Sequence, residues 1–248
     1  MQIICEEDGT IDCENGLTTH KPIPKSLAQL KTVATPSACR SVCFYKGDTY
    51  VGLDDYSIAR VGENGQITIS VVRFGNYVDS IAVYNDRIYT LVYGRPFVVH
   101  VHDLAGNPVK QWNHTDNGGA GTGNQLAIIS DQVVVPDRSS SRITIYSLDG
   151  ETVRQIPCSQ LANRAIAMCD GGDNSIIISD YGACHVFRVS LADGRVMWTA
   201  PNITYAQGVA LYRKKYVCVV NPQNQPMMWI LCIKTGWYNS LSTSSILV

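Results

Sequence analysis

The chain has 248 residues, a formal net charge of −1 and 45% hydrophobic residues. This balanced charge excludes the global positive field with which nucleic-acid-binding domains attract phosphate, so any such binding must come from local clusters. The sequence contains no apolar run of about 18 residues or more, and it therefore predicts no membrane-spanning helix.

The first 35 residues show the weakest pattern. Segments 3–7 and 10–14 are predicted to pair as a hairpin, and 27–34 alternates as a strand does. The N-terminus lacks the basic and apolar regions of a secretory signal. Nine scattered cysteines, several of them inside apolar strands, are typical of reduced thiols. We therefore expect a cytoplasmic protein without disulfides.

The segment 125–157 has the pattern of four short strands in a row. Val and Ile are frequent in these strands, and turn residues separate them at Ser130-Asp131, at 137–141 and at Asp149-Gly150. One such sheet cannot bury both of its faces, so it needs neighbouring copies of itself.

The sequence contains such copies. Residues 180–196 repeat the order of bend, strand, Asp-Gly turn and strand found in 137–153. The turn glycines follow one another at steps of 41, 44, 44 and 42 residues: Gly65, Gly106, Gly150, Gly194 and Gly236. A period in the low forties with four strands per unit is the signature of a β-propeller blade.

We therefore expect a single all-β propeller domain over residues 1–248, built from four-stranded blades. The repeat units are placed at 36–75, 76–117, 118–160, 161–202 and 203–242. We expect six blades, because the termini 1–35 and 243–248 would together form a last blade and remove the exposed sheet edges of an open array. A ring of five blades is the alternative.

The clearest units also carry a family resemblance. The succession VVVPD or IIISD, a polar bend, RITIY or HVFRV, and LDGETV or ADGRVM resembles the NHL-repeat propeller. It is most similar to the propellers that end tripartite-motif (TRIM-NHL-like) ubiquitin ligases, over about residues 36–242. The second unit departs from the pattern with Tyr93-Gly94 in place of the bend Asp, and the fifth with Asn221.

The resemblance implies a non-enzymatic recognition domain, the target-recognition part of a tripartite-motif-like ligase. It implies a protein partner or RNA, single-stranded or stem-loop, and a domain that is monomeric in isolation. No cofactor is implied, and any ligase chemistry would lie outside this chain.

The loops after the second and fourth strands of each unit are expected on one side of the ring. Arginines there offer bidentate contacts, and tyrosines offer rings for stacking. The predicted binding residues are Arg73, Tyr77, Arg95, Arg138, Arg142, Arg164, Tyr181 and Tyr205. Arg40 and the aromatic Phe74 lie on the same side. Aspartates such as Asp54 and Asp55 would repel a phosphate backbone, so we prefer a protein partner to RNA.

Two other sets of residues are candidates for chemistry. His100 and His102 share a strand face, but zinc needs three or four ligands and no third has suitable spacing, so we interpret them as strand-face histidines. Asp137 and Asp180 recur at the blade pitch, and we interpret them as bend-forming residues rather than catalytic acids.

A calcium-dependent hydrolase of the lactonase or esterase type is the alternative function. Its candidate ligands, Asp79, Asn124 and Asn163, lie near the starts of inner strands. Calcium takes about 6–8 oxygen ligands with more than one carboxylate, whereas this set offers one carboxylate and two amides. The sequence therefore favours a non-enzymatic domain without a metal site.

Overall fold

A computed structural model describes residues 34–62, 65–114, 125–137, 140–161, 165–180, 182, 184–203, 206–212, 216–221, 227–232 and 238–242. These residues form five four-stranded sheets, and each sheet is an antiparallel meander of one continuous stretch of chain. Over these ranges, no helix is long and apolar enough to cross a membrane.

Four consecutive strands make up each sheet. The first sheet contains β1 (Cys39–Tyr45), β2 (Asp48–Leu53), β3 (Ser57–Val61) and β4 (Ile67–Arg73). The second contains β5 (Val78–Tyr84), β6 (Arg87–Val92), β7 (Phe97–Asp103) and β8 (Pro108–His114). The third contains β9 (Ala127–Ile129), β10 (Gln132–Asp137), β11 (Arg142–Ser147) and β12 (Thr152–Pro157). The fourth contains β13 (Ala165–Gly172), β14 (Ser175–Asp180), β15 (His185–Ser190) and β16 (Val196–Ala200). The fifth contains β17 (Gly208–Tyr212), β18 (Tyr216–Asn221), β19 (Met227–Cys232) and β20 (Tyr238–Ser242).

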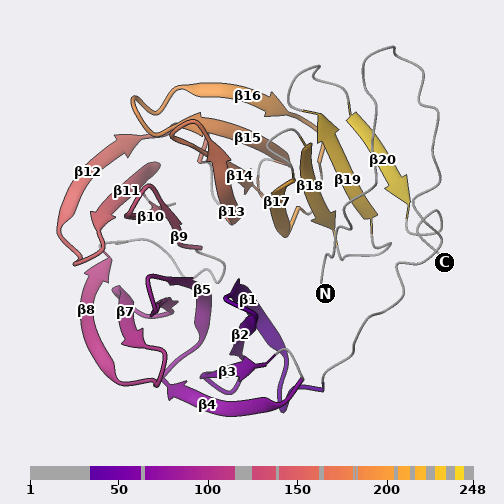
Figure 1. Cartoon of the computed structure of the whole chain (residues 1–248). Helices are drawn as coiled ribbons and strands as arrows, with labels where there is room; N and C mark the ends of the chain where they lie inside the picture. The colour runs from indigo at the N-terminus through magenta and orange to yellow at the C-terminus, as the bar shows by residue number, and fades with distance from the viewer. Residues whose placement is uncertain are drawn as a thin grey trace.

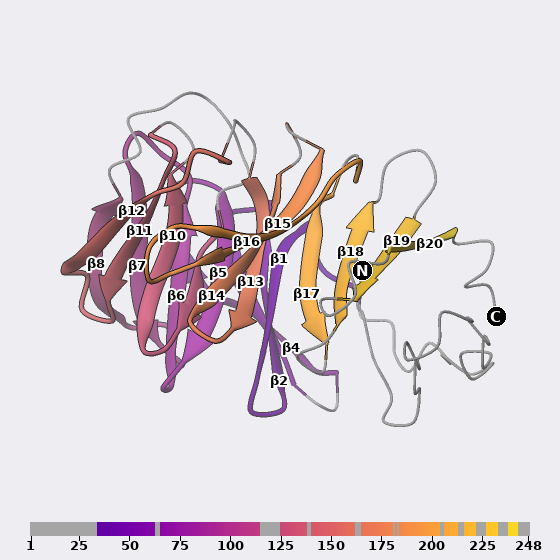
Figure 2. The same cartoon turned by 90° about the horizontal axis from the view of Figure 1, so that it is seen from above.

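The sheets are arranged around a common axis, each with its first strand innermost and its fourth strand on the rim (Figure 1). Their strands run between two faces that carry the loops (Figure 2). We call the face with the loops after the second and fourth strands of each sheet the even-loop face, and the opposite one the odd-loop face. This arrangement is that of a β-propeller, so the predicted all-β propeller fold is confirmed.

Two-residue turns on the odd-loop face close the first hairpin of each of the first four sheets. Both central residues have positive φ in all four of these turns: Lys46-Gly47, Asn85-Asp86, Ser130-Asp131 and Asp173-Asn174. Positive φ at both positions is the type I′ geometry, whose twist matches that of the flanking strands. Asn, Asp and Gly tolerate this conformation best, which explains why they occupy most of these positions.

Hydrophobic cores fill the spaces between neighbouring sheets. Each contains fully buried side chains from both sheets: Ile58 and Ile88, Val99 and Val133, Ile143 and Phe187, and Ile177 and Val217, in chain order. Both faces of an inner sheet are therefore apolar, as the need for neighbouring copies requires.

The structure corrects the expected ring of six blades. The described residues give five sheets and four cores between sheets, and no described buried cluster joins β17–β20 to β1–β4. A closed ring of six blades would need six such cores, and the five-bladed alternative would need a fifth. The prediction of a sixth blade comes only from the argument that exposed sheet edges must be covered. Most of the residues assigned to it, 1–33 and 243–248, lie outside the described residues.

The first strand shows what this correction means for side chains. Cys43 and Tyr45 pack against the second sheet, whereas Val42 and Phe44, on the opposite face of β1, are 59% and 70% exposed. A closing blade would have covered these two apolar side chains. On the same face, Val51 and Leu53 of β2 and Ala59 of β3 are buried in a separate cluster, so the exposed apolar surface is confined to β1.

Polar contacts tie the inner strands of neighbouring sheets together. In each, a backbone N–H donates to a side chain from the preceding repeat unit: Val83 to Cys43 Sγ at 3.3 Å, Leu126 to Ser80 Oγ at 3.1 Å, and Met168 to Gln125 Oε1 at 2.8 Å. On the odd-loop face, Tyr45 and Tyr84 donate their hydroxyl groups to Asp86 and Asp131 in the first turn of the next sheet.

Three of the turn glycines that define the repeat lie against the rim strand of the preceding sheet. Gly106, Gly150 and Gly194 have φ of 89°, 86° and 76°. A Cβ added to them would lie very close to that strand: 1.9 Å from Val71 O in β4, 2.5 Å from the Trp112 ring in β8 and 2.4 Å from Pro157 O in β12. Only glycine satisfies both the positive φ and this close approach.

Gly150→Ala is expected to lower the free energy of unfolding by about 2–4 kcal/mol, because the cost of positive φ adds to an overlap with Trp112. Gly172→Ala, with φ of 72° and nothing within 4 Å of the added Cβ, isolates the cost of φ and should lose less. Gly75→Ala, also in open space, should change stability by less than about 0.5 kcal/mol. Chemical denaturation measures all three. Equal losses for Gly150→Ala and Gly172→Ala would contradict the close approach.

Candidate functional site

On the even-loop face, the first two sheets bring an arginine and two tyrosines together. Arg40 lies at the start of β1, Tyr56 in the β2–β3 bend, and Tyr77 just before β5. Arg40 Cζ lies 4.3 Å from the centroid of the Tyr77 ring, and the rings of Tyr56 and Tyr77 meet edge to face at 4.9 Å. A guanidinium over an aromatic face contributes about 0.5–1 kcal/mol at exposed sites. We call these three residues, together with Asp54, which forms an ion pair with Arg40, the tyrosine platform.

Backbone hydrogen bonds position the loops that carry the platform. The Asp54 N–H donates to Ala38 O at 2.9 Å, and the Phe74 N–H donates to Tyr56 O at 2.8 Å. Tyr56 has φ of 68°, in the left-handed region that residues other than glycine rarely adopt. Such a conformation persists where the surrounding contacts over-determine it, and it is common at binding sites.

Aspartates neutralise the arginines of this region. Arg40 Nε lies 2.6 Å from Asp54 Oδ1, and Arg73 Nη2 lies 3.6 Å from Asp55 Oδ2. Partly exposed ion pairs of this kind contribute about 0–1 kcal/mol to stability, so their main effect is to orient the side chains. The region therefore presents paired charges rather than a net positive field.

The phenol of Tyr56 stays neutral. A hydrogen bond with the side chain of Tyr77 holds the pKa of Tyr56 above its ordinary value. The carboxylate of Asp54 acts in the same direction, and Arg40 acts against it. Because the ordinary pKa of tyrosine is already about 10, Tyr56 offers a neutral hydroxyl group over the physiological range.

The structure brings some of the predicted binding residues together. Tyr77 belongs to the tyrosine platform, and Arg73 adjoins it through its ion pair with Asp55, the neighbour of Asp54. Arg95 is exposed in the β6–β7 loop. A backbone hydrogen bond just before this loop, from the Tyr93 N–H to Tyr77 O at 2.9 Å, ties its base to the platform.

Other predicted binding residues are not part of this cluster. Arg142 lies in the third sheet, where its Nη1 donates to Gln155 Oε1 at 3.3 Å, and no described contact links it to Arg73, Tyr77 or Arg95. The remaining four lie outside the described residues: Arg138, Arg164, Tyr181 and Tyr205.

Sequence reasoning missed Tyr56 and misplaced Phe74. Tyr56 follows Asp54-Asp55, the counterpart in the first unit of the Asp137 bend, and aligning the two bends would have placed it on the even-loop face. Phe74, expected as an exposed stacking residue, instead packs into the core between the first and second sheets.

Asp137, one of the two aspartates predicted to form bends, has that role in the structure. Asp137 is buried and accepts hydrogen bonds from the Ser140 backbone N–H at 3.2 Å and from its hydroxyl at 2.5 Å. Asp55 accepts the same two bonds from Ser57, at 3.2 and 2.5 Å. A carboxylate that accepts local backbone bonds fixes a bend.

The candidate metal ligands do not assemble into a described site. Across the described ranges, no group of three or more His, Cys, Asp or Glu side chains could hold a metal ion. His100 and His102 do share a face of β7, as predicted, with ring centroids 6.1 Å apart. Of the calcium candidates, Asp79 is buried in β5, whereas Asn124 and Asn163 lie outside the described residues.

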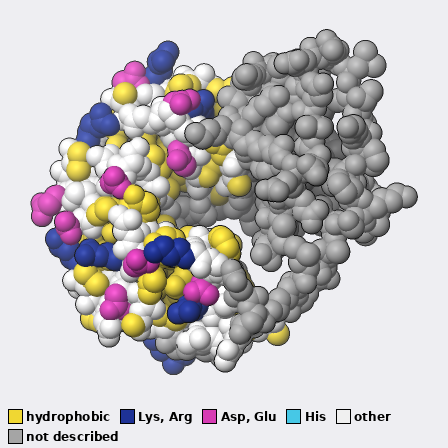
Figure 3. Space-filling model, in the orientation of Figure 1, with side chains coloured by type: hydrophobic (Ala, Val, Ile, Leu, Met, Phe, Trp, Pro, Cys, Tyr) yellow, Lys and Arg dark blue, Asp and Glu magenta, His cyan; other side chains and the backbone are white. Residues whose placement is uncertain are grey.

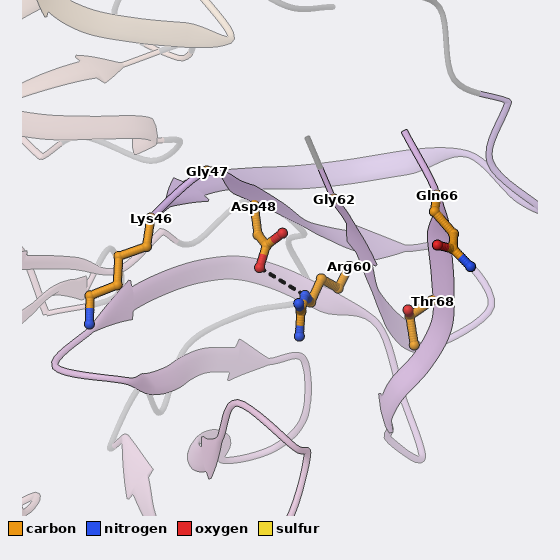
Figure 4. A pocket seen from close by; sticks show the side chains of 7 residues that line it. All are labelled: Lys46, Gly47, Asp48, Arg60, Gly62, Gln66 and Thr68. Atoms are coloured by element: carbon orange, nitrogen blue, oxygen red, sulfur yellow. Dashed lines mark ion pairs between the residues drawn. The ribbon is translucent and has the colours of Figure 1, made fainter. Parts of the chain in front are cut away.

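A polar groove of about 560 Å³ lies on the odd-loop side of the first sheet (Figure 4). Its lining residues are Lys46, Gly47, Asp48, Arg60, Gly62, Gln66 and Thr68. Both of its cations are paired with carboxylates: Arg60 Nε lies 2.9 Å from Asp48 Oδ2, and Lys46 Nζ lies 2.8 Å from Asp86 Oδ1. The groove therefore offers an anion no unpaired cation from these residues, and we do not place the binding site there.

No protein family matches the chain by sequence, and no curated protein matches it either. Solved structures share its fold. A protein of unknown function from Bacteroides caccae has a TM-score of 0.66 at 9% identity, over 87% of this chain and 85% of that one. A streptogramin B lyase has a TM-score of 0.65 at 13% identity, over 84% and 70%. The WD40 β-propeller domain of Doa1 has a TM-score of 0.60 at 8% identity, over 85% and 84%. At such identities the likeness shows the propeller fold alone.

Asp55→Ala is expected to lower the free energy of unfolding by about 1–3 kcal/mol, because the buried Ser57 would lose the acceptor of its N–H and hydroxyl. Asp54→Ala, next to it, removes only a partly exposed ion pair and should cost less than about 1 kcal/mol. Thermal or chemical unfolding distinguishes the two. A larger loss for Asp54→Ala would show that the bend is not held by Asp55.

Proposed function

We propose that the chain is a non-enzymatic recognition domain that binds a partner protein through the tyrosine platform. The observation that carries this proposal is the stack of Arg40 on Tyr77, with Tyr56 against its edge. Arg and Tyr are enriched among the residues that dominate binding free energy at protein interfaces. Because neighbouring contacts already orient these side chains, little conformational entropy is lost when a partner binds.

The balance of charges supports a protein partner rather than RNA. Arg40 and Arg73 are each paired with an aspartate, so a phosphate group would meet carboxylates beside the guanidinium groups. Figure 3 shows acidic, basic and hydrophobic side chains interspersed over the described part of one face of the molecule. RNA affinity comes largely from cations that release counterions, whereas protein interfaces combine aromatic rings with polar rims.

The proposal also concerns the larger protein to which such a recognition domain would belong. We propose that the domain is the target-recognition part of a ubiquitin ligase of the tripartite-motif type, with the ligase chemistry outside this chain. The support is the resemblance of the third and fourth units to NHL repeats, in the segments that form β10–β12 and β14–β16.

Tyr77→Ala is expected to weaken partner binding by about ten- to thirty-fold, or about 1.4–2 kcal/mol. The purified chain, used as bait in an extract treated with ribonuclease, provides the partner, and titration calorimetry measures the affinity. Tyr84→Ala is the matched control. Tyr84 is likewise a half-buried tyrosine near an aspartate, but it lies on the odd-loop face, so its removal should leave the affinity unchanged.

Three outcomes would contradict the proposal. Equal losses for Tyr77→Ala and Tyr84→Ala would show that the platform is not the binding surface. A ligand that is captured from an untreated extract but not from the ribonuclease-treated one, and whose affinity falls steeply with salt, would be RNA. A melting temperature raised by calcium, together with hydrolysis of lactones or esters, would replace recognition with the hydrolase alternative.

A further inference from the structure

Two histidines lie side by side in the interface between the first and second sheets. His100 and His102 alternate along β7, on the strand face opposite the side chains that pack against the third sheet. Their rings are nearly parallel, with an interplanar angle of 25° and centroids 6.1 Å apart. The Phe74 ring, from the β4–β5 connection of the first sheet, lies 5.1 Å from His100 and 5.5 Å from His102.

Both imidazoles are poorly placed to carry a charge. His102 is only 7% exposed, and no described group forms a hydrogen bond with its buried Nδ1. Burial holds the pKa of both histidines below the ordinary value, and the neighbouring His102 lowers the pKa of His100 further. The neutral form of the pair is therefore the one that fits this interface.

The surroundings of the pair offer little to offset a positive charge. The residues opposite it on β6 and β8, and the ring that contacts it from the first sheet, do not ionise: Thr90, Gln111, Ile88, Pro108 and Phe74. Asp103 is the carboxylate that acts on His102 and favours its charged form. Its two oxygens are already engaged at the exposed turn by the Asn107 N–H at 2.8 Å and the Asn107 side chain at 2.7 Å.

We propose that His100 and His102 form an acid-sensitive latch between the first and second sheets. Above about pH 7 the two neutral rings pack against Phe74. On acidification both rings take up a proton, the two like charges repel each other in a poorly solvated space, and Phe74 loses its packing partner. The described core that joins the first sheet to a neighbour is the one it shares with the second sheet, and the latch acts on this attachment.

The direction of the pH effect follows from where protons bind. In the unfolded chain both histidines titrate near pH 6.5, whereas the folded interface resists protonation. Between the folded and unfolded pKa values the unfolded chain binds more protons, so acid favours unfolding. The stabilisation is fully present above about pH 6.5 and is lost as pH falls through the folded pKa. Each pH unit between the two values lowers the folded-to-unfolded ratio tenfold per histidine.

The test compares melting temperatures between pH 7.5 and 5 for the wild type and the double variant His100→Gln/His102→Gln. Glutamine is polar but takes up no proton, so the double variant should lose less of its melting temperature on acidification. His185→Gln is the matched control. His185 is half-buried with its ring 5.1 Å from Phe187, but β15 holds no second histidine, so this variant should follow the wild type. A double variant as acid-sensitive as the wild type would overturn the latch.

Two measurements on the wild type decide the question if the double variant does not fold. Proton NMR of the imidazole rings should give titration midpoints below 6.5 for His100 and His102. Hydrogen exchange, corrected for intrinsic rates, should show protection in β4 and β7 falling at least tenfold between pH 7.5 and 5.5, while protection in β10 and β14 changes less. Midpoints at or above 6.5, or an equal loss in all sheets, would refute the proposal.

Discussion

The approach of Gly106, Gly150 and Gly194 to the rim strand of the preceding sheet sets the spacing between the first four sheets. At Gly194 the turn comes so near to β12 that a methyl group would not fit. Arg154, on that same strand, donates to the backbone oxygens of Leu191 and Ala192 at the start of the turn. With this outer contact fixed, the cores and the inner-strand hydrogen bonds fall into register. A one-residue shift of a strand would turn its apolar side chains to the wrong face.

The sequence predicts the repeating features of the fold well, namely the turn glycines and the strands between them. Gly106, Gly150 and Gly194 have the positive φ expected of turn glycines, and strands with β-branched residues lie between them. The sequence predicts the number of blades and the closure of the ring poorly. Closure depends on contacts between residues far apart in the chain, and such contacts leave no local signal like that of a turn. The exposed Val42 and Phe44 illustrate the difficulty, since their alternation on β1 has the pattern of a covered strand.

The candidate site could be predicted only to the level of a face. Counting strands places Arg73 and Tyr77 on the even-loop face, and the structure joins them to one cluster. Whether a loop side chain then points outward depends on one or two backbone angles, which propensity does not determine. For this reason Phe74 lies in a core where an exposed ring was expected, and the ion pair of Arg40 with Asp54 could not be foreseen.

The continuity of each sheet in the chain has a consequence for how the protein folds. Every sheet is a meander of one stretch of chain, and each described core between sheets joins two sheets that are consecutive in the chain. Hairpins with two-residue turns form within about 1–10 μs, so each sheet can assemble locally before it docks on its neighbour. During synthesis the first two sheets emerge together and can bury their shared core before the last sheet leaves the ribosome. The stability of such an array accumulates interface by interface, as in other repeat proteins.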